Sequence, residues 1–191
     1  MSIDTFVAAK STSTLAWSAL ILLIASSTLL ESLNPKNAVR ERLKDKYFST
    51  DMTPAYGPGR LFTMLRLYEE DDFKAHKRFL RRHDLIYPVL YGFSMTIMLA
   101  YLKGALAPGD DHRIKYLWAI PLGAMLFDYL ENLSMYLILN NYDKNGVPPT
   151  ALAIFSSAMT TLKILFLAAA LVLLLAGAAG LLLKKVWHLR L

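Results

Sequence analysis

Two acidic residues lie inside a long apolar stretch of the sequence. In LFDYLENLSMYLIL, residues 126–139, Asp128 and Glu131 are followed by Asn132. The three positions are i, i+3 and i+4, so on a helix their side chains share one face. Counted from Leu139 at about 1.5 Å per residue, Asp128 lies about 16 Å deep. An ionised carboxylate facing lipid at that depth costs several kcal/mol, so we expect this face to point into a helix bundle or a wet cavity.

A counter-charge for these acids is found in the next apolar stretch. In IFSSAMTTLKILF, Lys163 is the only basic residue between Lys144 and Lys184. A short loop, residues 140–149, joins the two stretches, so the helices should be antiparallel neighbours with Lys163 level with the two acids. One lysine for two acids leaves one acid either protonated or bound to another group.

Hydroxyl groups of the preceding apolar stretch should lie in the same region. Tyr87, Tyr91 and Ser94 recur at helical spacing within residues 85–102, and Asp84 comes just before them. Tyr87 lies at the membrane boundary, where a tyrosine is ordinarily an interfacial anchor. All these groups enter the bilayer from the side of the same two loops. The sequence therefore predicts a polar pocket that opens to that side, with the first loop placed to cover it.

The candidate site residues form two groups. The candidates for catalysis are Asp128, Glu131 and Lys163, and the candidates for ligand binding are Asp84, Tyr87, Tyr91, Ser94, Asn132 and Thr160. The acid that is not paired with Lys163 could act as a general acid or base. Lys163 itself could neutralise an acid or meet an anionic head group. A buried ion cluster with a structural role and a path for protons or ions are the alternatives.

The composition is typical of a membrane protein. Of 191 residues, 55% are hydrophobic, and the mean hydropathy of +0.35 is high for a chain that must cover a soluble surface. Four stretches are long enough to cross about 30 Å of hydrocarbon: about 14–30, 85–102, 116–139 and 151–183. The last is too long for one upright crossing unless it tilts or emerges. We expect an all-α, integral membrane four-helix bundle, with residues 1–191 forming one domain.

The first apolar stretch has a second interpretation. Lys10 precedes it and small residues follow at Ala25, Ser26 and Ser27, a pattern that also fits a cleaved signal peptide. The apolar run is longer than a signal peptide usually has, and Asp4 weakens the positive amino-terminal region. These two features favour a retained helix.

The first loop, residues 31–83, carries twelve of the chain's 21 Lys and Arg residues. Within it, residues 58–83 are predicted to form one broken or two short amphipathic helices, after the turn-forming TPAYGPG. A helix lying on the membrane surface and a small solvated cap that packs only on itself both fit this pattern. The basic residues favour the cytoplasmic side of a bacterial inner membrane for this loop, although the basic carboxyl-terminal end opposes that orientation.

Residue content excludes several kinds of chemistry. The chain has no cysteine, which rules out disulfides, thiolate metal sites and cysteine nucleophiles. Its four histidines form no metal-ligand pair, and no nucleophile-elbow, phosphate-loop or zinc-protease motif is present, so we expect no metal and no cofactor. The net charge of +6 comes from basic residues interleaved with acids, which argues against nucleic acid. Membrane lipid and a hydrophobic small molecule are the expected partners, and homo- and hetero-oligomers both remain open.

The order of these motifs resembles a group of small bacterial four-helix membrane proteins. The similarity rests on D-x-x-Y-P at residues 84–88, D-x-x-E-N at residues 128–132 and Lys163 in the last helix, and it covers about residues 60–170. That group has no assigned activity, so the resemblance implies an architecture and site candidates but no reaction. The expected function is binding or modification of a lipid-like molecule, with a non-catalytic membrane subunit or scaffold as the alternative.

Overall fold

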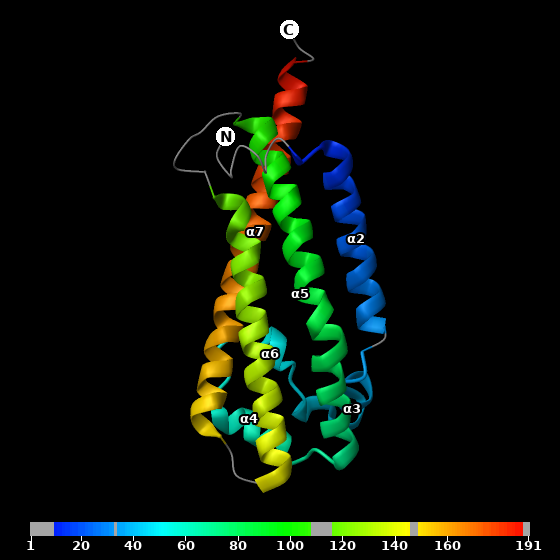
Figure 1. Cartoon of the computed structure of the whole chain (residues 1–191), viewed down its shortest axis with the longest axis vertical. Helices are drawn as coiled ribbons and strands as arrows, with labels where there is room; N and C mark the ends of the chain where they lie inside the picture. Colours follow the sequence, from blue (N-terminus) through cyan, green and yellow to red (C-terminus); the bar gives the residue numbers. More distant parts are fainter. Residues whose placement is uncertain (1–9, 33, 108–115, 146–148, 189–191) are drawn as a thin grey trace.

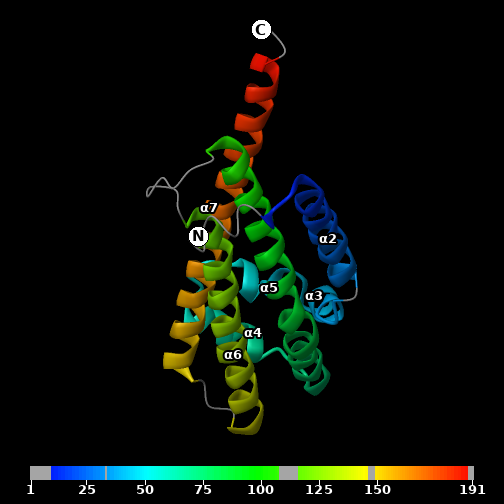
Figure 2. The same cartoon turned by 45° about the horizontal axis from the view of Figure 1, so that its top comes forward.

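The computed structural model describes residues 10–32, 34–107, 116–145 and 149–188, and every regular element within them is helical. Four long helices run alongside one another in Figure 1: α2 (Ser13–Ser32), α5 (Glu70–Leu106), α6 (Ile120–Asn145) and α7 (Thr150–His188). α5 contacts the other three, and α6 also packs along α7. α2 lies on the outer side of α5 (Figure 2).

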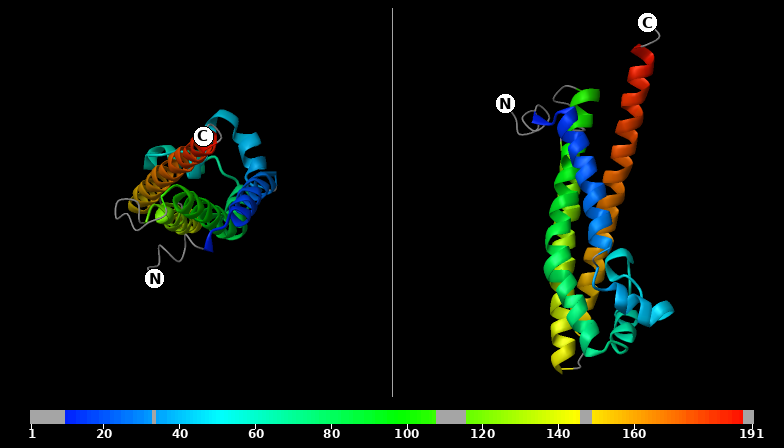
Figure 3. Two further views of the ribbon diagram at one scale, coloured as in Figure 1. Left: turned by 90° about the horizontal axis from the view of Figure 1, so that it is seen from above. Right: turned by 90° about the vertical axis from the view of Figure 1, so that its right-hand side faces the viewer.

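The shorter elements connect these four helices. The first loop contains α3 (Asn37–Leu43), η1 (Lys44–Lys46), η2 (Thr50–Met52) and α4 (Pro58–Leu65), and η3 (Leu117–Ala119) precedes α6. The first-loop elements gather where α2 ends and α5 begins (Figure 3). We call this end of the molecule the loop-side end.

Within the described residues, three helices are long and apolar enough to cross a membrane: α2, α5 and α7. The prediction of an all-helical chain with membrane-spanning character is therefore confirmed in this form. α6 is 26 residues long and lies beside these helices, but it carries Asp128 and Glu131 in its middle. The last apolar stretch was expected either to tilt or to emerge at one end, and the structure shows that it emerges (Figure 3). α7 has 39 residues, and its carboxyl-terminal part extends past the other helices (Figure 3).

α5 is one continuous helix, which corrects the predicted boundary between an amphipathic segment and a separate span. The helix begins with a capping box in which Glu69 and Asp72 bond each other's backbone N–H groups. Pro88 therefore lies well inside a helix, because 18 residues of α5 precede it. A proline in a helix interior frees the carbonyl four residues earlier, which here belongs to Asp84.

The first loop packs on the long helices rather than on itself. Its buried side chains form one apolar core with the loop-side ends of α5, α6 and α7: Val39, Leu43, Phe48, Tyr56, Leu61, Phe62, Met64, Leu65 and Tyr68 meet Phe73, Phe79, Leu80, Met135, Ile138, Leu139 and Ala153. The apolar face of α4 is buried against protein, so neither a helix with that face in lipid nor a self-contained cap is correct. On α6 this core extends to Met135, ten residues before the helix ends at Asn145.

A second core holds the bundle together further from the loops. It consists of Tyr91, Met95 and Leu99 on α5, Ala124 on α6, and Ala170 and Leu174 on α7. Small residues bring α6 and α7 close together there, since Gly123 lies directly against the ring of Phe166. This packing fixes the register of α6 against α7, and the register in turn places the charged residues.

Candidate functional site

Lys163 lies between the two acids of α6. Its Nζ is 3.3 Å from Asp128 Oδ1 and 2.6 Å from Glu131 Oε2. All three side chains are buried. The sequence prediction that Lys163 is level with both acids on a neighbouring antiparallel helix is confirmed. A single ammonium group thus joins α7 to α6 through two carboxylates.

Asp128 has further partners. Its Oδ2 accepts a hydrogen bond of 2.9 Å from the Tyr91 hydroxyl, and its Oδ1 accepts one of 3.2 Å from Asn132 Nδ2. We expected the acid not paired with Lys163 to be either protonated or bound to another group. Lys163 instead contacts both acids, and Asp128 is also bound by Tyr91 and Asn132. These residues form a closed ion cluster, which we define as Asp128, Glu131, Lys163, Tyr91 and Asn132.

Asn132 also bonds the backbone carbonyl that Pro88 leaves without a donor in α5. Its Nδ2 donates to the freed carbonyl oxygen of Asp84 at 3.3 Å, and the Tyr129 hydroxyl donates to the carbonyl of Leu85 at 2.7 Å. Both donors come from α6. A proline within a membrane helix is tolerated when neighbouring helices satisfy the carbonyls it frees. The two motifs at residues 84–88 and 128–132 are thus two halves of one contact between α5 and α6.

The predicted depth of the ion cluster was counted from Leu139, and the structure places Leu139 in the loop-side core. On α5 the exposed large apolar residues begin at Leu85, and Tyr91 lies about 9 Å beyond Leu85 along the helix. Because Tyr91 bonds Asp128, the cluster is level with this position of α5.

Asp84 is the acid whose side chain keeps an unused oxygen. The residue is 8% exposed, and its buried Oδ2 has no hydrogen-bond partner among the described residues. The charged groups around it are Lys36, Asp51, Asp128 and Lys163. Asp84 was a predicted site residue, but the acid not paired with Lys163 was expected to be Asp128 or Glu131 on α6.

The remaining predicted ligand-binding residues point in different directions. Tyr87 turns towards α2, where its hydroxyl lies 3.1 Å from Ser27 Oγ. Thr160 donates to the carbonyl of Ser156 at 3.1 Å and lies buried on α7. Ser94 is buried on α5, and no hydrogen bond links it to the ion cluster in the described part of the chain. Tyr91 and Asn132 are thus in the cluster, whereas Tyr87, Thr160 and Ser94 are beside it.

A residue that sequence analysis missed covers the cluster from the loop side. Tyr56, in the turn TPAYGPG, donates a hydrogen bond of 2.9 Å to Ser156 Oγ, and the backbone N–H of Ala55 donates to Thr161 Oγ1 at 2.9 Å. Burial raises the pKa of Tyr56 to about 12, so its hydroxyl stays protonated as a donor. The proline and glycine residues of the turn predicted a loop, but a contact across 100 residues leaves no local pattern.

A second ion pair, also missed, lies in the first loop. Lys36 Nζ is 3.1 Å from Asp51 Oδ1, and the ammonium group lies 3.6 Å above the centre of the Phe79 ring. Lys36 is 3% exposed, which is unusual for a lysine. Burial alone would raise the pKa of Asp51, but attraction to Lys36 and Lys163 outweighs it and holds the pKa below its usual 3.8.

This depressed pKa predicts a pH-dependent contribution to stability. Because the pKa of Asp51 is lower in the folded protein than in the unfolded chain, its contribution is fully present above about pH 4 and is lost as the pH falls further. The difference in thermal stability between the wild type and Asp51→Asn should therefore shrink below pH 3.8. Denaturation in detergent at pH 7, 5 and 3 measures it. A difference that is the same at all three values contradicts the assignment.

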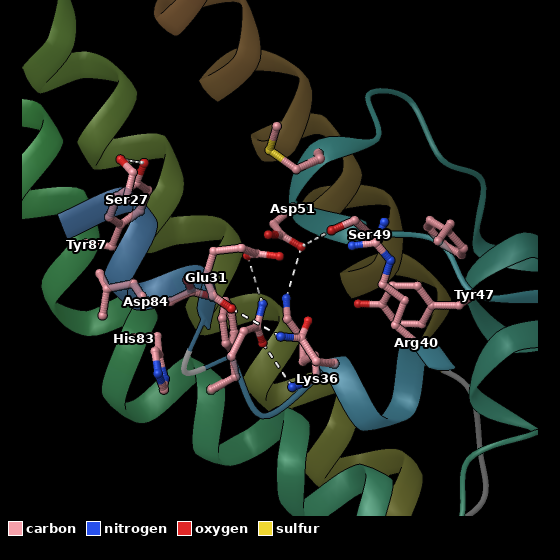
Figure 4. Close-up of a pocket in the computed structure, with 16 residues that line it drawn as sticks. Ser27, Glu31, Lys36, Arg40, Tyr47, Ser49, Asp51, His83, Asp84 and Tyr87 are labelled. Atoms are coloured by element: carbon pink, nitrogen blue, oxygen red, sulfur yellow. Dashed lines mark hydrogen bonds and ion pairs between the residues drawn. The ribbon is translucent and has the colours of Figure 1, made fainter. Parts of the chain in front are cut away.

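A cavity of about 580 Å³ lies at the loop-side end, between α2, the first loop and α5 (Figure 4). Its lining includes Ser27, Glu31, Lys36, Arg40, Tyr47, Ser49, Asp51, His83, Asp84 and Tyr87. Of the sequence-predicted site residues, Asp84 and Tyr87 line it. Asp128, Glu131 and Lys163 do not. The space available to a ligand therefore lies next to the ion cluster, because Asp51 and Asp84 of its lining are close enough to Lys163 for their charges to interact.

None of the protein families, curated proteins or solved structures compared with the chain matches it. The resemblance carried by the motifs at residues 84–88 and 128–132 therefore stays a prediction.

Proposed function

We propose that the protein is a multi-pass membrane protein that binds a lipid-like molecule, with the polar head of that molecule in the loop-side cavity. The observation that carries the proposal is the cavity itself. It is large enough for a head group, and its lining includes Asp84, whose buried Oδ2 has no hydrogen-bond partner among the described residues. Small-molecule sites are typically concave, with a few polar groups placed in a mostly apolar lining.

The depth of the cavity fits a lipid head group. On α5, Lys74, Lys77, Arg78, Arg81 and Arg82 line one surface before Asp84. Directly after Asp84, Leu85, Ile86 and Val89 are exposed. Such a change from basic to apolar surface along one helix is expected where the helix enters the hydrocarbon. Asp84 and the cavity would then be at the level of the head groups.

We further propose that α6 is the fourth spanning helix. Its acids need not face lipid, because both are buried in contact with Lys163. In this arrangement Asp128, Glu131 and Lys163 hold α6 and α7 in register, and the proposal gives them no catalytic step. The alternative function, a scaffold without a ligand, is favoured by the same closed cluster, since a fully paired cluster can be purely architectural.

The orientation we propose places the first loop in the cytoplasm of a bacterial cell. The basic surface before Asp84 on α5 supports it, because cytoplasmic loops carry an excess of Lys and Arg. The chain has no cysteine, so a single introduced thiol reports its own position. An impermeant maleimide should label Trp187→Cys on intact spheroplasts, and Glu41→Cys only in inverted vesicles. The reverse pattern would overturn the orientation.

The proposed function predicts that an amphiphile stays bound during gentle purification. Native mass spectrometry of the wild-type chain should show a retained lipid-like mass. Ser27→Trp, which places a large ring at the cavity lining, should remove it, whereas Thr28→Trp, at the exposed neighbouring position, should not. An empty wild-type chain in several detergents, or equal occupancy in both variants, would favour the scaffold instead.

A further inference from the structure

The charges around the loop-side cavity do not balance. Five carboxyl groups lie there and in the adjoining ion cluster: Glu31, Asp51, Asp84, Asp128 and Glu131. Three Lys and Arg side chains accompany them. Lys36 is held by Asp51, Lys163 is held by Asp128 and Glu131, and Arg40 is exposed. Glu31 is exposed, and Asp84 is the buried acid that neither lysine pairs with. A buried carboxylate without a partner is costly, so a cation that binds there gains the interaction that the protein leaves unmade.

The unused oxygen belongs to a side chain of the cavity lining. Asp84 is more than nine-tenths buried, yet it lines the cavity, and its Oδ2 has no partner among the described residues. Tyr87 lines the same wall one helical turn further along α5. Aromatic rings beside a carboxylate suit an ammonium group, because the ring face attracts a cation. Figure 4 shows Asp84 across the cavity from the Lys36–Asp51 pair.

We propose that the cavity selects amphiphiles whose head carries a positively charged amine, with Asp84 as the counter-ion. This inference rests on the proposed function and names the class of its ligand. Three acids line the cavity, Glu31, Asp51 and Asp84, against two basic side chains, Lys36 and Arg40. The excess of acids disfavours a head group that is only negative. A zwitterionic head is compatible as well, because Arg40 lines the same cavity with its side chain exposed and can meet a phosphate.

Head-group preference can be measured with probes that share one chain. Dodecylamine, dodecanol and dodecyl phosphate are titrated against the full chain in an uncharged maltoside detergent, and the bound fraction is read by native mass spectrometry. The wild type should bind the amine at least about tenfold more tightly than the alcohol, and the phosphate most weakly. A preference for the phosphate, or equal binding of amine and alcohol, would overturn the inference.

Three variants test the role of Asp84. Asp84→Asn keeps the shape and should reduce amine affinity at least about tenfold while leaving dodecanol unchanged. Asp84→Glu retains the charge and should keep the preference for the amine. Glu41→Gln, at an exposed acid of α3, is the matched control and should behave as the wild type. Amine affinity that changes less than about twofold in Asp84→Asn would remove Asp84 as the counter-ion.

Two further results separate this inference from the proposed function. If all three probes bind equally and Ser27→Trp blocks them all, the cavity binds amphiphiles and only the preference for an amine is wrong. If none of the probes binds, both the preference and the proposed function fail. An ethanolamine phospholipid is added last to distinguish a zwitterionic phospholipid from a simple amine amphiphile. Binding of the phospholipid should weaken in Arg40→Gln, whereas binding of dodecylamine should not.

Discussion

Replacing Lys163 with methionine is expected to destabilise the protein by about 3–5 kcal/mol. The substitution removes the one cation that Asp128 and Glu131 share and leaves both carboxyl groups buried, at 6% and 2% exposure. The loss should be visible as a lower midpoint of unfolding when the purified protein is titrated with a denaturing detergent.

The matched control neutralises the whole cluster. Combining Lys163→Met with Asp128→Asn and Glu131→Gln removes every charge at once, so the triple variant should lose less than about half of what Lys163→Met loses alone. The three sites are in direct contact, and strong non-additivity is therefore expected. Equal destabilisation of the single and triple variants would mean that packing around the Lys163 stem matters more than its charge.

Substituting Gly123 with alanine should cost about 1–3 kcal/mol. A Cβ at this position would lie 2.5 Å from Cε1 and 2.6 Å from Cδ1 of Phe166, which is too close for any real contact. The Phe166 ring has little freedom to move away, because it packs edge-on against Phe127 with their centres 5.2 Å apart. The α6–α7 register would then shift, and thermal unfolding of the purified protein would report the loss.

Two variants separate this clash from the general effect of losing a glycine. Adding Phe166→Leu to Gly123→Ala should recover part of the loss, since the shorter side chain gives the new methyl group room. Gly59→Ala, in α4, meets nothing within 4 Å and should leave stability unchanged or slightly higher. If Gly59→Ala is as harmful as Gly123→Ala, close approach of α6 and α7 is not the cause.

The contact between Lys163 and the α6 acids could be predicted because it depends only on the length of the connection between α6 and α7 and on the helical rise per residue. A short connection makes α6 and α7 antiparallel neighbours, and a fixed rise per residue then sets which positions are level. The predicted depth of about 16 Å was counted from Leu139, on the premise that the end of the apolar run marks the membrane boundary. Leu139 is apolar for a different reason, which is its burial under α4 and the rest of the first loop.

The parts of the candidate site that could not be predicted join distant positions through a loop. Lys36 and Asp51 are 15 residues apart with α3 and η1 between them, and Tyr56 reaches Ser156 across 100 residues. Neither pairing follows a helical or strand period. The contact between Asn132 and α5 is the exception, because Pro88 indicates it. A proline inside a helical pattern frees a carbonyl group, and an asparagine on a neighbouring helix can donate a hydrogen bond to that group.

The shared ammonium group of Lys163 also affects how the chain could enter a bilayer during synthesis. Taken alone, α6 would bring two acids into hydrocarbon and α7 would bring one lysine, each at a cost of about 2.5–3.5 kcal/mol near the centre of a helix. Presented together as a hairpin, the two helices largely cancel that cost before either meets lipid. In the proposed bundle, α6 can therefore span the membrane only together with α7. The insertion machinery must accept the two helices as one hairpin.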